Sequence, residues 1–227
     1  MAGSVSYLSA VKKQRAKALE SADNTESATR AAVPQEPDYA ELHMLSNFTF
    51  LEGASHPEEL VLRAAELGYK AVAITDECTL SGAVRAHIEA KVQGVKLLVG
   101  SRFKVDGRLI ILLAMDRQGY AQLCELITRG RRRAEKGSYQ LALADFEQGL
   151  ERCLCLLQPG PEIRGLEVES CWLAEHFPQR GWLLAERLLD SDDGWRYRRI
   201  ADWAREHQFS CVAAGAVLMH SAKRKPL

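Results

Sequence analysis

Hydrophobic and polar positions follow two alternating patterns from residue 39 onward. Short apolar runs such as "KAVAIT" (70–75) and "VKLLVG" (95–100) have the length and composition of buried strands. Longer runs such as "HPEELVLRAAELG" (56–68) and "SGAVRAHIEAKVQG" (81–94) space their apolar residues three and four apart, as helices do. Strands that alternate with helices of this length predict an α/β fold with a largely parallel sheet.

Local signals predict where several elements begin and end. The first helix has Ser55 as a candidate N-cap, Pro57 in its first turn and Gly68 at its C-terminal stop. Asp106 and Gly107 lie between two apolar runs and predict a hairpin over 101–114. Further strands are expected at 39–44, 151–160, 181–189 and 209–217, and further helices at 118–137, 169–178 and 194–208. About seven strands in this length suit a small or distorted barrel as well as an open sheet.

The first 38 residues differ from the rest of the chain. They are rich in Ala, Ser and charge, and they end in "AAVPQEPD". The run "VSYLSAVKKQRAKALE" (5–20) suits a helix, but a helix this short is marginal in water without packing. We therefore expect a mostly disordered leader over 1–38 and a single domain over 39–227. The final "VLMHSAKRKPL" resembles neither a helix end nor a closing strand, so we expect a fragment of a longer protein.

Composition narrows the choice of function. Lys+Arg and Asp+Glu both number 30, so zero net charge gives no global attraction to nucleic acid or to an anionic membrane. No run approaches a membrane span and no apolar signal core opens the chain, which predicts a cytoplasmic protein. The six cysteines form no C-x-x-C pair; Cys153 and Cys155 would share one side of a strand, and most are expected to act as small core hydrophobes.

Functional side chains in a parallel α/β fold gather at the carboxyl ends of the strands. Four predicted strand ends carry the candidates: "LHMLS" (42–46), "ITDEC" (74–78), "VGSRF" (99–103) and "AGAVLMH" (214–220). In this order and spacing they resemble the PHP (polymerase and histidinol phosphatase) domain. Together with "ITRGRRRAEKGSY" (127–139), "ITDECTL" resembles the PHP domain at the N-terminus of error-prone bacterial C-family DNA polymerases. This resemblance covers residues 39–227 and implies a distorted (β/α)7-type barrel.

Metal-binding members of the family place ligands on four motifs, which can be compared position by position. His-x-His corresponds here to His43 and Leu45, and Thr-Asp-His corresponds to Asp76 and Glu77 after Thr75. In Gly-x-Glu the carboxylate position holds Arg102, and in Asp-x-His both ligand positions are replaced, by Ala216 and Leu218. The resemblance therefore implies a vestigial metal cavity with no bound metal and no catalytic residue in this chain.

The chemistry of the replacements supports this interpretation. A hydrolytic site for several cations needs many nitrogen and oxygen ligands. Arg102 instead places a permanent positive charge in the cavity, and like unit charges about 4 Å apart repel by roughly 4 kcal/mol at an intermediate dielectric. We expect Arg102 to pair with Asp76 or Glu77, and Leu45 and Leu218 to fill the cavity with apolar bulk.

Simpler roles remain open for some of these residues. His43 can be a hydrogen-bonded core histidine, which we favour over a ligand. Asp76 precedes a helix and can be its cap instead of a partner of Arg102. His220 would face the same side as Leu218 if the strand continued, which would make it a displaced ligand; we disfavour this role.

The run "RGRRRAEKG" (129–137) is the strongest local concentration of charge. One interpretation is a solvated helix end favoured by the helix dipole. The other, which we favour, is contact with a phosphate backbone or with another part of a polymerase. No aromatic residues are interleaved, so stacking on single-stranded bases is not indicated. The residues concerned are Arg129, Arg131, Arg132, Arg133 and Lys136.

Three functions remain as hypotheses. The resemblance implies a catalytically degenerate scaffold and interaction domain of an error-prone DNA polymerase acting in translesion synthesis and damage-induced mutagenesis. Its partners would be the rest of the polymerase chain, with DNA bound through that chain, and mutagenesis proteins or the sliding clamp. No cofactor is expected in this chain, whereas Mg²⁺ is expected in the palm domain of the whole polymerase. The alternatives are a metal-dependent phosphoesterase or proofreading 3′–5′ exonuclease, and a free-standing binding module.

Overall fold

Strands and helices alternate along the chain as the pattern predicts. The computed structural model describes residues 39–159, 165–186 and 193–224, so the prediction of a disordered leader over 1–38 lies outside the described residues. The strands are β1 (Ala40–Met44), β2 (Ala71–Ile74), β3 (Lys96–Val105), β4 (Arg108–Ala114), β5 (Cys153–Gln158), β6 (Gly181–Glu186) and β7 (Cys211–Ala214). The helices are α2 (Pro57–Glu66), α3 (Ala83–Gln93), α4 (Arg117–Arg132), α5 (Leu166–His176) and α6 (Asp193–Glu206), with short 3-10 turns at Leu143–Phe146 and Ala222–Arg224.

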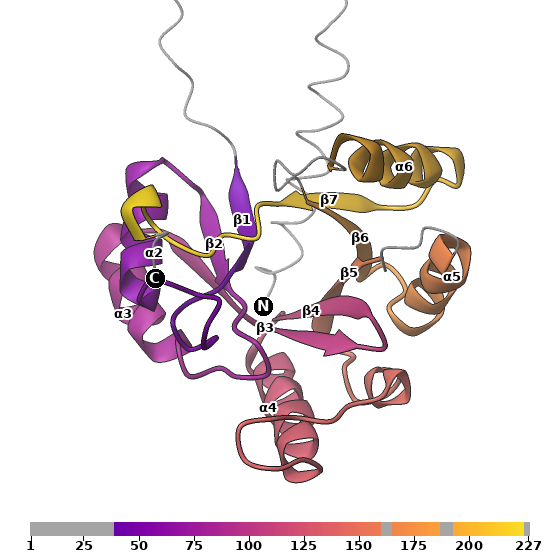
Figure 1. The fold of residues 1–227 in the computed structure, drawn as a ribbon, viewed down its shortest axis with the longest axis horizontal. Helices are drawn as coiled ribbons and strands as arrows, with labels where there is room; N and C mark the ends of the chain where they lie inside the picture. The colour runs from indigo at the N-terminus through magenta and orange to yellow at the C-terminus, as the bar shows by residue number, and fades with distance from the viewer. Residues whose placement is uncertain (1–38, 160–164, 187–192, 225–227) are drawn as a thin grey trace, which may run out of the picture. The chain divides into compact units, whose positions relative to one another are not determined.

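The seven strands form one sheet in sequence order, and the sheet almost closes on itself (Figure 1). Neighbouring strands are parallel from β1 to β3 and from β5 to β7, whereas β4 is antiparallel to both of its neighbours. A parallel bridge between Met44 and Val217 joins the end of β1 to the chain after β7. Of the two architectures left open by the sequence, the distorted barrel is therefore the one formed.

The reversal of direction at β4 comes from the predicted hairpin. Asp106 and Gly107 both adopt left-handed backbone conformations, with φ of 48° and 76°. A two-residue turn of this kind twists in the same sense as the strands it joins, which favours Asn or Asp followed by Gly. The "DG" signal thus explains why the sheet is mixed.

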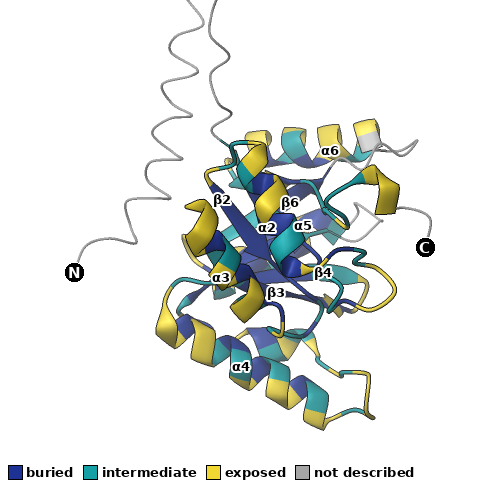
Figure 2. Ribbon diagram, turned by 90° about the vertical axis from the view of Figure 1, so that its left-hand side faces the viewer, coloured by how far each residue is buried: buried dark blue, intermediate teal, exposed yellow. Residues whose placement is uncertain are grey.

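Among the described residues, three apolar clusters hold the layers together. One is built from strand residues and fills the barrel, with Ala73, Ile111, Leu156 and Leu184 among its members. The other two lie between the strands and the surrounding helices, and Figure 2 shows buried strands inside and exposed outer helix faces. Among the described residues, no helix has the length and apolar character needed to cross a membrane.

The cysteines of β5 behave as the strand pattern predicts. Cys153 and Cys155 are both buried in the cluster between the strands and the helices, whereas Leu154 and Leu156 belong to the barrel interior. Burial raises the pKa of the Cys153 thiol to about 12, which keeps it protonated and apolar in character. Cys78 is also buried, whereas Cys171 is exposed.

Several element boundaries differ from the prediction by a few residues, and two of these differences have a clear physical reason. Ser55 is not the N-cap of α2: that position is His56, whose N–H donates to Glu59 Oε2 (2.8 Å), and the Ser55 hydroxyl instead contacts His220. The predicted helix over 118–137 ends earlier, at Arg132. Gly130 explains this, because the returning chain packs Leu141 against it and Gln140 N–H bonds its carbonyl oxygen at 3.0 Å.

Candidate functional site

The four strand ends singled out by the sequence meet at one end of the barrel. Val217 exchanges backbone hydrogen bonds of 2.9 Å with His43 and Leu45, which places the end of β7 beside that of β1. A second bridge joins Glu77 to Arg102 and places the end of β2 beside β3. The candidate positions therefore surround one region, for which we keep the name cavity, although side chains such as Leu45 and Arg102 fill it.

Arg102 lies inside this cavity and is bound by two carboxylates. Only 5 % of the residue is exposed. Its guanidinium donates to Glu77 Oε2 at 2.7 and 3.2 Å and to Glu52 Oε2. Lys104 adds a second positive charge, at 2.7 Å from Glu52 and 3.2 Å from Glu77. Of the two predicted partners of Arg102, Glu77 is the one that pairs with it.

Tyr139 completes this group from a different part of the chain. Its hydroxyl donates to Glu77 Oε1 (3.1 Å) and accepts from the backbone N–H of Lys104 (2.7 Å). Burial, and secondarily the negative charge of Glu77, raises the pKa of the Tyr139 phenol, so it acts as a neutral donor. We call Glu52, Glu77, Arg102, Lys104 and Tyr139 the mouth cluster.

Asp76 has neither of the roles expected for it. It does not cap α3, whose N-cap is Gly82. Among the described residues, its carboxylate has no hydrogen bond to the Arg102 guanidinium, and the two residues are joined only through the backbone, where the Arg102 N–H donates to the Asp76 carbonyl oxygen at 3.2 Å. Its carboxylate accepts from the Ser46 N–H (2.7 Å), the Ser46 hydroxyl (2.6 Å) and the Thr49 hydroxyl (2.7 Å). Burial raises the pKa of Asp76, although these bonds and the charge of Arg102 oppose that rise. Asp76 therefore fastens the loop after β1.

His43 is the hydrogen-bonded core histidine that we favoured. It is buried, and its Nδ1 lies 2.5 Å from Glu186 Oε1 at the end of β6. If Glu186 is ionised, its carboxylate only accepts hydrogen bonds, and Nδ1 is then the donor in this pair. Glu186 also accepts from Gln158 Nε2 at 2.9 Å. The other nitrogen of His43, Nε2, has no hydrogen-bond partner among the described residues.

Glu41 is a second buried acid on β1. Its carboxylate accepts from the Gly215 N–H at 3.0 Å, from the His43 N–H at 3.0 Å and from the Tyr39 hydroxyl at 2.9 Å. A Cβ on Gly215 would come within 2.6 Å of Glu41 Oε2, so glycine permits this close approach. We call Glu41, His43 and Glu186 the seam group, because they link β1 to β6 and to the chain after β7.

The remaining cavity positions separate into buried and exposed residues. Leu45 is fully buried, as predicted. Leu218 is 37 % exposed, so the prediction that it fills the cavity is wrong. The cause is Ala216, whose φ of 47° turns the chain after β7 and ends the strand alternation on which the prediction was based. For the same reason His220 is not a displaced ligand but bonds Ser55 through Nδ1 (2.8 Å).

The residues present do not suit a metal centre. The described residues contain no group of three or more His, Cys, Asp or Glu side chains arranged to hold a metal ion. Asp76 has its oxygens occupied by hydroxyl and amide donors, and both Glu77 and Glu52 are neutralised by Arg102 and Lys104. A cation here would face a guanidinium instead of a ligand.

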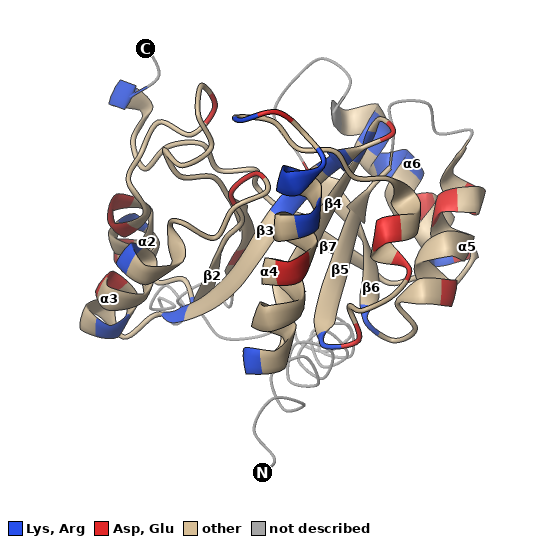
Figure 3. Cartoon of the chain, turned by 90° about the horizontal axis from the view of Figure 1, so that it is seen from below, with Lys and Arg blue, Asp and Glu red and all other residues tan. Residues whose placement is uncertain are grey.

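The basic run lies at the end of α4, where the ribbon in Figure 3 is blue, the colour of Lys and Arg. Arg131 has a structural role: its guanidinium donates to the carbonyl oxygens of Cys78 (3.1 Å) and Ser138 (3.1 Å). Arg133 binds Asp145 Oδ2 at 2.6 Å, and Arg129 lies 3.5 Å from Asp145 Oδ1. Within the described part of the chain, no hydrogen-bond or ion-pair partner is seen for Arg132 or Lys136, and both are exposed.

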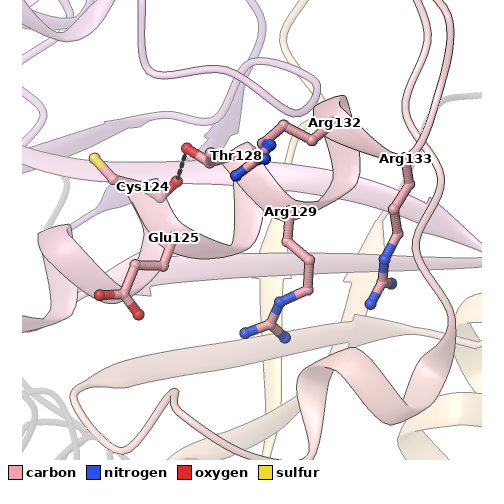
Figure 4. A pocket seen from close by; sticks show the side chains of 6 residues that line it. All are labelled: Cys124, Glu125, Thr128, Arg129, Arg132 and Arg133. Carbon is pink, nitrogen blue, oxygen red and sulfur yellow. Dashed lines mark hydrogen bonds between the residues drawn. The ribbon is translucent and has the colours of Figure 1, made fainter.

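An open groove of about 530 Å³ follows the outer face of α4 (Figure 4). Thr128 donates to the carbonyl oxygen of Cys124 at 2.7 Å, so its hydroxyl is already used within the helix. The groove contains an acid, Glu125, beside its three arginines, and it lacks the enclosure of a small-molecule site. Its lining residues are Cys124, Glu125, Thr128, Arg129, Arg132 and Arg133.

Several residues that form the site were missed by reasoning from the sequence. Glu186 ends the buried run "WLLAE", so applying the strand-end rule to this strand as well would have found it. Glu41 precedes His43 by two residues in an apolar strand, and a charged residue there is itself a signal of a buried partner. Glu52 carries no such signal, because only folding brings its loop to Arg102.

Comparisons with known proteins agree with this geometry. The family model described as "PHP domain" matches residues 41–191. The chain is 48 % identical over 198 residues to an error-prone DNA polymerase of Methylococcus capsulatus, covering 86 % of this chain and 19 % of the relative. It is 50 % identical over 190 residues to one of Pseudomonas paraeruginosa, covering 83 % of this chain and 18 % of the relative. The chain thus spans about a fifth of the length of these relatives.

Solved structures support the fold at much lower identity. A protein of Bifidobacterium adolescentis classed as a metal-dependent phosphoesterase superposes with a TM-score of 0.59 at 13 % identity, covering 85 % of this chain and 91 % of that one. An amidohydrolase of Chromobacterium violaceum, with bound sulfate and no metal, superposes with a TM-score of 0.56 at 14 % identity, covering 79 % of this chain and 87 % of that one. The match to the family model covers well over half of the chain, and so this chain belongs to the PHP domain family.

Proposed function

We propose that this chain is the PHP domain of an error-prone DNA polymerase. The support is the identity of 48–50 % to proteins of that name, together with the short share of those proteins that it spans. The whole protein would extend a primer during translesion synthesis and DNA repair in the cytoplasm. Its Mg²⁺ ions would be held by a palm domain that is not part of this sequence.

Within that polymerase we propose a scaffold and interaction role for this domain, without metal-dependent hydrolysis. The observation that carries this proposal is the buried Arg102, whose guanidinium binds Glu77 and Glu52. Removing one partner of a buried ion pair leaves an uncompensated charge, which is strongly unfavourable. A metal that drew Glu77 or Glu52 away from Arg102 would have to overcome this cost.

Elemental analysis tests the absence of a metal. After dialysis against metal-free buffer, we expect far less than one zinc or manganese ion per chain. Addition of either metal should leave the thermal midpoint unchanged, because a ligand stabilises only the state that binds it. Stoichiometric metal that survives dialysis would contradict the proposal.

Restoring the ligands is the complementary experiment. Arg102→Glu combined with Leu45→His should bind Mn²⁺ more tightly than the unmodified chain, because both positions are buried among the strand ends, whereas Leu218 is exposed and is left unchanged. Arg129→Glu is the matched control, because it makes the same change of charge on an exposed helix face. If the double variant keeps its circular dichroism spectrum and gains no affinity, the cavity is not a vestigial metal site.

The main alternative is a metal-dependent phosphoesterase or proofreading 3′–5′ exonuclease. It rests on fold similarity to a protein of that class at 13 % identity. Hydrolysis of a phosphodiester that depends on added metal and is lost in Asp76→Asn would favour it.

A free-standing binding module is the third possibility, and it would be favoured if no polymerase palm followed these residues in the gene.

The exposed side chains of Arg132 and Lys136 are our candidates for a phosphate or interdomain contact. Arg129, Arg131 and Arg133 have partners within the domain, which makes them poorer candidates than the sequence indicated. Mutagenesis proteins and the sliding clamp are further proposed partners. Charge reversal at Arg132 and Lys136 together should weaken primer–template binding by the whole polymerase if the contact is with phosphate.

A further inference from the structure

The loop between β1 and α2 carries two apolar side chains at its tip. Phe50 is 82 % exposed, and Leu51 is as exposed as in an extended peptide, at 105 %. The backbone of Leu51 is left-handed, with φ of 67°, a conformation that is unfavourable for any residue with a Cβ except Asn and Asp. An exposed aromatic residue beside a strained leucine is an unusual combination on a surface.

Both sides of this tip are fastened by cavity residues. On the N-terminal side, Asp76 binds Ser46 and Thr49. On the C-terminal side, Arg102 and Lys104 bind Glu52. The positions that correspond to metal ligands in the family thus hold a loop in this chain.

The backbone of the loop is also fixed. The N–H of Gly53 donates to the Thr49 carbonyl at 3.0 Å, and the N–H of Ala54 donates to the Leu218 carbonyl at 2.8 Å. A Cβ on Gly53 would lie 2.0 Å from the carbonyl oxygen of Ser46, so only glycine allows this closure. The tip therefore has one defined shape, and little conformational entropy is lost when a partner covers it.

We propose that Phe50 and Leu51 form a docking knob that inserts into an apolar pocket of the polymerase chain outside these 227 residues. This inference rests on the proposed function. Two side chains bury far less than the roughly 1,000 Å² that a free association needs. A contact within one chain is held at high effective concentration and needs much less. The relatives are about five times as long as the segment matched here. A polymerase of that length has several hundred further residues that can form the pocket.

A second apolar feature provides a matched control. Val84, Ile88 and Val92 lie one turn apart on the outer face of α3, and each is more than half exposed. They lack the strained backbone and the cavity anchors of the knob. Variants of this ridge should therefore leave the interdomain contact unchanged.

Hydrogen exchange on the whole polymerase tests the knob. Amides of residues 48–53 should exchange at least tenfold more slowly in the polymerase than in the 227-residue chain. The double variant Phe50→Ser with Leu51→Asn should abolish this difference, whereas Ile88→Ser should preserve it. All three substituted side chains lie on the exposed surface, and circular dichroism checks that each variant is folded.

The other outcomes overturn the proposal. Equal exchange of 48–53 in both proteins would show that the knob is free. Protection that rises with the concentration of the 227-residue chain would show that a second copy is the occupant. Primer extension by the same whole protein tests the proposed function separately: an active polymerase with a free knob removes only the docking inference, and an inactive one removes the polymerase assignment.

Discussion

The seam group and the mouth cluster are two ionic arrangements near the same end of the barrel, and they are built differently. In the seam group, Glu41 accepts hydrogen bonds mainly from backbone N–H groups, and Glu186 is bound to His43. In the mouth cluster, charged side chains bind one another, and Lys104 and Glu52 reach solvent. One group joins strands to each other, and the other joins a loop to a strand.

This difference determines how much each group contributes to the stability of the fold. Buried polar atoms without partners are costly, so the seam group must remain complete for the barrel to close. Partly exposed charges can regain water when a partner is lost, so the mouth cluster contributes less to stability. The seam group should therefore control global unfolding, and the mouth cluster should control the position of the loop that carries Phe50 and Leu51.

The largest expected effect is that of Glu41→Ala. This change leaves the N–H groups of Gly215 and His43 and the hydroxyl of Tyr39 without their acceptor, and it opens a cavity. At roughly 1–3 kcal/mol for each unsatisfied group, we expect a loss of about 4 kcal/mol, measured by urea unfolding. Glu66→Ala on the exposed face of α2 is the control and should change stability by less than about 0.5 kcal/mol. A small effect of Glu41→Ala would mean that the seam group does not close the barrel.

Removing the central cation of the mouth cluster should have a smaller effect. Arg102→Met leaves Glu77 and Glu52 close together, but Lys104 stays and water can reach both acids. We expect a loss of about 2 kcal/mol, below the 3–5 kcal/mol typical of a fully buried pair. Arg102→Met with Glu77→Met should recover part of this loss. If the double variant is as unstable as the sum of the single ones, the two side chains do not interact.

The sequence predicted the part of this arrangement that depends on local pattern. Strand and helix alternation gave the α/β class, and Asp106-Gly107 gave the hairpin that reverses β4. Arg102 in a ligand position led to the expectation of a carboxylate partner, and Glu77 is that partner.

The wrong and missed predictions have one physical cause. Local sequence patterns, such as the alternation of side chains along a strand, no longer place a residue once the chain turns. Leu218 was placed by extending β7, but Ala216 at positive φ redirects the chain. Ser55 suits a helix cap by type, yet its hydroxyl binds His220, 165 positions away in the chain. Glu52 reaches Arg102 only through the fold of an irregular loop, and no periodic pattern encodes that contact.

A third substitution tests whether the left-handed backbone at Leu51 lowers the stability of the isolated chain. Leu51→Asn should raise the stability of the isolated chain by about 1 kcal/mol, because Asn tolerates left-handed φ better than Leu and the exposed leucine has little packing to lose. Thermal unfolding measures the gain. Leu67→Asn, at an exposed residue of the same type in the right-handed region at the end of α2, should give no such gain. A loss in Leu51→Asn would show that Leu51 packs against this domain and is not held for a partner.

The smallest expected effect is the pH dependence of Glu52. Burial raises the pKa of this acid, but hydrogen bonds from Lys104 and Arg102 outweigh burial, so the pKa lies below its usual value of 4.5. An acid with a lowered pKa stabilises the fold above its unfolded pKa, and that contribution is lost as the pH falls through its folded pKa. The difference in thermal midpoint between the unmodified chain and Glu52→Gln should therefore shrink as the pH falls from 7 to below 4.5. Asp76, whose pKa is raised, acts in the opposite direction but equally in both proteins, so it cancels in the comparison. A midpoint difference that stays constant from pH 7 to pH 3 would mean that Glu52 is not held by charge in the mouth cluster.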